Sequence, residues 1–211
     1  DPYTQGPKLF ARNCASCHRY DNHDGLGQQP KDEISASDLK GFGSREWLAR
    51  FFDPAEIAGP RNWGGTHFTD GDMVQWVNEN VPEFDAEQTQ DLQKALFALS
   101  AEAKLPAQQA SDERDATLIE EGRELINGLL LACTDCHQFH ADGEGGDGPD
   151  LTGYASREWL VAFIADPSHA RFFGDNNDRM PSFGVEKSLS EMEIGLVADW
   201  LRGDWALAAG Q

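Results

Sequence analysis

The feature that most constrains this chain is a five-residue pattern, CxxCH, that occurs twice. It reads CASCH at residues 14–18 and CTDCH at residues 133–137, and the two copies use all four cysteines of the 211 residues. Cysteines two residues apart serve zinc half-sites, thiol–disulfide centres and the covalent attachment of c-type haem. The chain therefore has to fold around two local centres that share one chemistry.

Spacing and the closing histidine discriminate among these chemistries. Two halves of one zinc site are normally about 15–20 residues apart, but 115 residues lie between Cys17 and Cys133. Haem c needs two thiols for thioether bonds and an imidazole directly after them to ligate the iron. We therefore predict two covalently bound haem c groups, with Cys14 and Cys17 holding haem 1, Cys133 and Cys136 holding haem 2, and His18 and His137 as proximal ligands.

A longer repeat follows each CxxCH. DLKGFGSREWL at residues 38–48 recurs as DLTGYASREWL at residues 150–160, with eight of eleven positions identical, and the first copy is preceded by an extra KDEISAS. Internal self-similarity of this kind indicates repeated structural units. We predict two domains, residues 1–104 and 117–211, joined by a polar linker at residues 105–116.

Apolar residues recur at helical spacing in both halves, and no alternating strand pattern occurs. Helices are expected at about residues 6–15, 86–102, 117–132 (with Leu118, Leu125 and Leu129 on the apolar face) and 190–202. Ser44 and Ser156 are typical N-caps for two shorter helices that end at Asp-Pro pairs. The chain is thus predicted to be all-α, with Trp47 and Trp159, at matched positions, packing each core.

Other residues are candidates to complete the two centres. A ligating imidazole normally donates its second N–H to a carbonyl or carboxylate, and Pro30 and Pro149 each lie twelve residues beyond a proximal histidine. We expect their carbonyls to orient His18 and His137.

The residues also suggest distal ligands. Met180, before a proline and the last helix, is the expected distal ligand of haem 2; Met192 is its rival but is expected to be a core residue of that helix. For haem 1 the candidates are His67 and Met73, and spacing alone does not choose between them.

The charge balance limits the partners. With 17 basic and 37 acidic residues, the formal charge is −20, which argues against nucleic acid or anionic lipid and favours a positively charged protein. No apolar run approaches the roughly 20 residues of a membrane helix, so membrane attachment is expected only through sequence outside these residues.

The stretches GPKLFARNCASCHRYDNHDGLG, DLKGFGSREWL, NDRMPSFG and LVADWLRGDW resemble class I cytochrome c domains in tandem. More narrowly, they resemble the dihaem cytochrome c region joined to cytochrome b in some bacterial bc-type quinol:cytochrome c reductases. In that group a segment similar to GGTHFTDGDMVQWV carries methionine at the position of Met73, which favours Met73 over His67 as the distal ligand of haem 1.

This resemblance implies electron transfer rather than enzymatic bond chemistry. The implied donor is a Rieske or cytochrome c1-like protein, and the acceptor a positively charged redox protein. Haem c attachment outside the cytoplasm implies a location in the periplasm or on the outer face of the cytoplasmic membrane. The alternative is a dihaem peroxidase or a haem-based sensor with an open site at haem 1.

Overall fold

The computed structural model describes residues 1–143, 146 and 148–205, and these residues form helices and isolated bridges without any strand ladder. The α-helices are α1 (Pro2–Asn13), α2 (Arg45–Phe51), α3 (Asp72–Asn80), α4 (Ala86–Glu102), α5 (Gln109–Arg114), α6 (Ala116–Ile126), α7 (Arg157–Ala165) and α8 (Glu191–Arg202). Short 3-10 turns are η1 (His67–Asp70), η2 (Val81–Glu83), η3 (Pro106–Gln108), η4 (Cys133–Asp135) and η5 (Gly174–Asn176). The all-α prediction is confirmed, and none of the described helices is both long and apolar enough to cross a bilayer.

The chain forms two compact units that interleave in sequence. Unit 1 contains residues 1–42 and 46–84 together with the chain from Leu196 on, and unit 2 contains residues 43–45 and 85–195. Helix α4 therefore belongs to unit 2 although it follows the first CxxCH, and most of α8 belongs to unit 1 although it follows the second. Whether residues 1–104 and 117–211 each fold alone stays a prediction.

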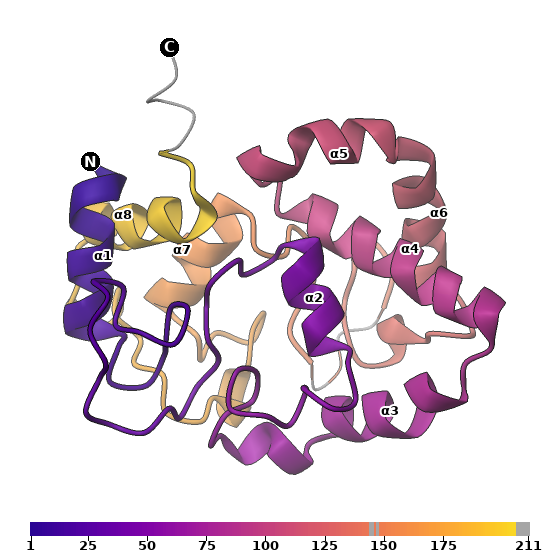
Figure 1. Ribbon diagram of the computed structural model, residues 1–211, viewed down its shortest axis with the longest axis horizontal. Coiled ribbons are helices and arrows are strands. Elements are labelled where there is room, and N and C mark those ends of the chain that lie inside the picture. The colour runs from indigo at the N-terminus through magenta and orange to yellow at the C-terminus, as the bar shows by residue number, and fades with distance from the viewer. Residues whose placement is uncertain (144–145, 147, 206–211) are drawn as a thin grey trace. The chain divides into compact units, whose positions relative to one another are not determined.

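Two helices lie against one another in each unit, α1 with α8 and α4 with α6 (Figure 1), and a glycine lies at each contact. In unit 1, a Cβ added at Gly6 of α1 would overlap the Cβ of Trp200 and lie 3.0 Å from the carbonyl oxygen of Leu196, both in α8. In unit 2, a Cβ at Gly122 of α6 would overlap the carbonyl of Lys94 in α4 and lie 3.0 Å from the Cβ of Ala98. In each crossing the glycine lies against two residues of the partner helix that are four apart in sequence. In both units, the helix before one CxxCH (α1 or α6) packs on the terminal helix of the other repeat (α8 or α4).

The boundaries of α4 and α8 follow the sequence prediction closely, whereas α1 begins four residues earlier than predicted and ends two residues earlier. Helix α4 has the expected bounds, with Leu92, Leu96 and Leu99 buried. Helix α6 ends at Ile126, six residues earlier than predicted, where Asn127 and Gly128 interrupt it. Its buried residues are Ile119, Gly122 and Ile126, whereas Leu118 and Leu129, predicted on the apolar face, are exposed. The apolar face predicted for α6 was therefore wrong.

Matched tryptophans organise the two cores in the same way. The indole Nε1 of Trp47 donates to the carbonyl of Asp38 (3.1 Å), and that of Trp159 donates to the carbonyl of Asp150 (3.0 Å). Both are buried, and each stacks on the phenylalanine four residues later in its helix. The packing role predicted for these two residues is confirmed.

The predicted linker, residues 105–116, contains η3 and α5 rather than an extended chain. The guanidinium of Arg45 binds the carboxylates of Asp112 and Asp115, and the backbone N–H of Arg45 donates to the side chain of Gln108. These contacts attach the segment to unit 2.

Candidate functional site

Both CxxCH motifs form the same tight turn. In unit 1 the N–H of Cys17 and the N–H of His18 donate to the carbonyl of Cys14, at 3.1 and 2.8 Å. In unit 2 the N–H of Cys136 and that of His137 donate to the carbonyl of Cys133, at 3.3 and 2.9 Å. The backbone therefore presents two thiols and one imidazole from a single turn at each centre.

The chemistry of the cysteines fits thioether attachment. All four lie in the described part of the chain, and none is in a disulfide. Burial, followed by the neighbouring thiol of Cys17, raises the pKa of Cys14 to about 12, and burial raises the pKa of Cys133 to about 11. A reactive redox cysteine has instead a lowered pKa. These two thiols are neutral at physiological pH, unlike the thiolates of a redox centre.

Each histidine after the cysteines is held through one ring nitrogen. Nδ1 of His18 lies 2.8 Å from the carbonyl oxygen of Ser37, and Nδ1 of His137 lies 2.7 Å from that of Pro149. Because a carbonyl only accepts, each Nδ1 carries the proton and each Nε2 is free to bind a metal. Burial lowers the pKa of both imidazoles, which favours the neutral, metal-binding form.

The carbonyl predicted for the first centre was wrong. His137 has the expected hydrogen bond to Pro149, but the partner of His18 is Ser37 and not Pro30. The extra KDEISAS explains the difference, because it places Ser37 directly before Asp38, as Pro149 stands directly before Asp150. Aligning the repeats backward from these aspartates would have identified Ser37. The role of Pro149 toward a haem stays a prediction.

A glycine loop packs closely around the second imidazole. A Cβ at Gly148 would lie 2.5 Å from Cε1 and 2.6 Å from Nδ1 of His137, and one at Gly146 would lie 2.7 Å from the carbonyl oxygen of Cys136. Side chains at these positions would push against the ring or its turn, so the glycines allow the backbone to hold the imidazole.

Unit 1 also buries hydrogen-bond donors that lack a partner within the described part of the chain. They are Nε1 of Trp205 and, close together in sequence, Nη2 of Arg50, Nε of Arg61 and Nε1 of Trp63. Buried donors without partners are costly, and they were not identified by the sequence analysis. The donors of Arg50, Arg61 and Trp63 fit a bound anionic group such as the carboxylates of a haem.

The candidate distal ligands lie in different local settings. Met180 is half-buried in the segment before α8, and its carbonyl accepts from the side chain of Asn177 (2.9 Å). Met73 is in the first turn of α3, packed against the cluster of Ile57, Val74 and Val77. His67 begins η1 and is exposed.

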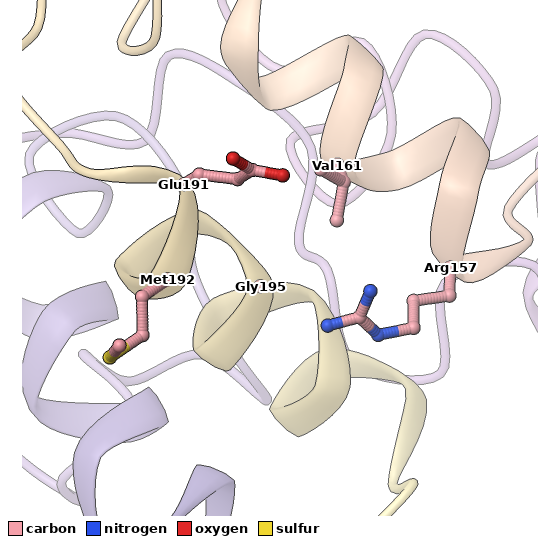
Figure 2. A pocket seen from close by; sticks show the side chains of 5 residues that line it. All are labelled: Arg157, Val161, Glu191, Met192 and Gly195. Carbon is pink, nitrogen blue, oxygen red and sulfur yellow. The ribbon is translucent and has the colours of Figure 1, made fainter.

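A surface hollow in unit 2 lies apart from these candidates. Figure 2 shows its lining, which consists of Arg157, Val161, Glu191, Met192 and Gly195. Met192, the rival of Met180 as distal ligand, is one of these residues, but none of the predicted haem-attachment or proximal-ligand residues lines the hollow. Met192 is 77% exposed, so the prediction that it is a core residue was wrong.

Comparison with known proteins agrees with this geometry. Residues 3–94 match the family model of cytochrome c, and residues 117–201 match that of the cbb3-type cytochrome c oxidase subunit III. No curated protein and no solved structure gives a significant match to the chain. The two family matches each include one CxxCH turn and imply one covalently bound haem c apiece. The chain therefore contains two cytochrome c domains in tandem.

Proposed function

We propose that this protein is the dihaem electron-transfer module of a respiratory quinol:cytochrome c reductase. The observation that carries the proposal is that the same centre is built twice, with two thiols in one turn and one imidazole hydrogen-bonded through Nδ1. When bound, each haem supplies a one-electron couple between ferrous and ferric iron. The two thiols of each turn would hold the haem through thioether bonds, and the carbonyl bonded to Nδ1 fixes the tautomer of the imidazole. The assignment to a reductase is supported by the sequence resemblance described above.

Met180 and Met73 are the proposed distal ligands. A thioether ligand opposite histidine raises the reduction potential, as a carrier between a quinol-oxidising complex and an oxidase requires. Support for Met180 comes from its fixed backbone next to a proline, and for Met73 from its half-buried place beside a compact apolar cluster.

Near-infrared magnetic circular dichroism of the ferric protein tests these ligands, because it separates methionine–histidine, bis-histidine and high-spin haems. We expect two methionine–histidine signals. Met73→Ala should remove one of the two methionine–histidine signals, and Met180→Ala should remove the other. The matched control His67→Ala should leave both signals unchanged. A bis-histidine signal that His67→Ala abolishes would replace Met73 by His67. A high-spin haem that binds carbon monoxide when reduced would favour the peroxidase or sensor alternative.

The charge of −20 suits a cationic redox partner. Attraction of this kind accelerates association at low ionic strength and weakens as salt screens it. We place the protein in the periplasm or on the outer face of the cytoplasmic membrane, with a Rieske or cytochrome c1-like donor. In membranes that contain a bc complex, we expect quinol to reduce both haems. An inhibitor of quinol oxidation should block this reduction.

A terminal oxidase module is the second candidate, because residues 117–201 match the family of the cbb3-type oxidase subunit III. In the same membranes this role predicts haem reduction that depends on an added soluble cytochrome, followed by rapid oxidation with oxygen. Reduction that persists when quinol oxidation is blocked would favour the oxidase and overturn the reductase assignment.

A further inference from the structure

Equivalent positions of the two centres are identified by matching backbone hydrogen bonds. The N–H of Leu39 donates to the carbonyl of Arg19, as the N–H of Leu151 donates to that of Gln138. Likewise, the N–H of Asp38 donates to Arg61, and that of Asp150 to Arg171. Within the repeat, Arg50 corresponds to Ala162. Two arginines of the first centre, Arg19 and Arg50, are therefore replaced by neutral residues in the second.

Arg19 is a buried cation beside the first proximal ligand. Only 7% of its surface is exposed. Its guanidinium donates to the carbonyls of Ala15 (2.8 Å), His18 (2.9 Å) and Asp32. It thus satisfies backbone carbonyls without neutralising its charge. Gln138, the equivalent in unit 2, is exposed.

Arg50 is connected to the same imidazole through a chain of hydrogen bonds. Its Nε donates to Oδ1 of the fully buried Asn62 (3.3 Å), the carbonyl of Asn62 accepts from the hydroxyl of Ser37, and the carbonyl of Ser37 holds His18. Its Nη2 is one of the buried donors without a partner among the described residues. An arginine keeps its charge in such a setting. In unit 2, Phe172 takes the place of Asn62 and removes this polar chain.

The acidic residues of the two units do not cancel this difference in the number of cations. Asp38 and Asp150 are equivalent and occur once in each centre. Asp150 pairs with Arg171 (3.1 Å), and Asp38 accepts from backbone N–H groups. Arg61 stands in the first centre at the position equivalent to Arg171, so these acidic and basic residues match in number between the two centres.

Unit 2 additionally buries the carboxylate of Glu102, which accepts from Nε2 of His140 (3.1 Å) and the N–H of Gly153. This carboxylate is itself paired with Arg123, whose Nε lies 3.9 Å away. At these equivalent positions the first centre therefore has two cations, Arg19 and Arg50, that the second lacks.

We propose that Arg19 and Arg50 raise the reduction potential of haem 1 above that of haem 2, so that haem 1 is the exit for electrons. The ferric form carries one more positive charge than the ferrous form, and a buried cation disfavours that extra charge. In the internal step ferrous haem 2 is oxidised and ferric haem 1 is reduced by one electron, with no proton transferred. This inference rests on the proposed electron-transfer function, and it adds the direction of transfer.

Spectroelectrochemical titration of the holoprotein, resolved into two one-electron waves, tests the order. Arg50→Gln should shift the higher wave to lower potential and leave the lower wave in place. Arg50→Lys, which keeps the charge, should shift it less. The control Arg114→Gln, at an exposed position of α5, should shift neither wave. A shift of the lower wave by Arg50→Gln, or no shift of either, would overturn the proposal.

A second variant keeps the test decisive if Arg50→Gln fails to fold. Gln138→Arg adds a cation at the position equivalent to Arg19 and should raise the lower wave alone. The rise should be smaller than the shift caused by Arg50→Gln, because Gln138 is exposed and solvent screens the added charge. A rise of the higher wave would place the higher potential at haem 2 and reject the proposed order. Both titrations are made without a partner protein, so failure of the reductase assignment would leave their outcome unchanged.

Discussion

At the scale of single residues, Gly148 tests how closely the backbone holds the second imidazole. Because a Cβ there would lie 2.5 Å from Cε1 of His137, we expect Gly148→Ala to displace the ring or its loop. The isolated protein should then contain a weakened second centre, seen as a partly high-spin ferric spectrum or as fewer than two haems per chain in a pyridine haemochrome assay.

Gly65→Ala is the matched control for this substitution. The nearest atom to a Cβ at Gly65 is 3.6 Å away, which is ordinary van der Waals contact. This variant should keep two low-spin haems. An unchanged spectrum in Gly148→Ala as well would mean that the loop yields without moving His137.

The indole of Trp159 provides a second test at this scale. Trp159→Phe keeps an aromatic ring but removes the hydrogen bond to the carbonyl of Asp150. We expect a loss of about 1 kcal/mol in the free energy of unfolding, the usual net worth of such a bond. Urea unfolding followed by the Soret band measures it.

Trp47→Phe should cost a similar amount, since Trp47 makes the equivalent bond to Asp38. If either variant shifted a haem potential without losing stability, the packing role assigned to these tryptophans would have to give way to one at the haem.

The carbonyl that binds His18 shows which contacts of single residues can be predicted from the sequence. The CxxCH turns and the partner of His137 followed from the sequence, because their geometry is local. Counting forward from His18 led to Pro30, since the count ignored the extra KDEISAS. The buried donors of Arg50, Arg61 and Trp63 could not be predicted, because burial depends on how distant loops pack.

At the scale of helices, the two glycine crossings are the sites most sensitive to added volume. Gly6→Val and Gly122→Val would each place a branched side chain against the backbone or Cβ of the crossing helix. Overpacking typically costs about 1–3 kcal/mol, and we expect losses at the upper end of that range because the obstacles cannot rotate away. Thermal unfolding of the holoprotein checks this expectation.

Gly195→Ala is the helical control. A Cβ at Gly195 would meet the end of the Arg157 side chain at 2.9 Å, and a flexible guanidinium can move aside. Alanine also has a better helix propensity than glycine, by roughly 1 kcal/mol. This variant should be as stable as the parent or slightly more so. Equal losses in all three variants would show that the crossings are not special.

Helix α4 and most of α8 were predictable because regular apolar spacing persists over their length. The bounds of α4 matched, whereas α6 ended early at Asn127 and Gly128, and its buried face was shifted. The spacing of Leu118 and Leu129 places them on one predicted apolar face, but apolar residues can also be exposed. Composition alone could not show which face meets a partner helix.

At the scale of the whole molecule, the sequence could not show which terminal helix packs on which glycine. Gly6 meets residues four apart in α8, and Gly122 meets residues four apart in α4. Since both terminal helices have the same kind of apolar spacing, the repeat is compatible with each domain using its own helix. The contacts instead pair α1 with α8 and α6 with α4, so each unit contains a helix from the other repeat.

This pairing predicts the behaviour of the chain when the segment between the repeats is cut. A protease site introduced at Gln109 and Ala110, both exposed, would separate a fragment containing α1 and α4 from one containing α6 and α8. Because α1–α8 and α4–α6 each join the two fragments, we expect them to co-elute in native size-exclusion chromatography with two haems, and to separate in urea. Introducing Gly122→Val should promote separation after cleavage. If the fragments of the parent separated as two folded monohaem proteins, each repeat would use its own terminal helix, and the interleaved units would be excluded.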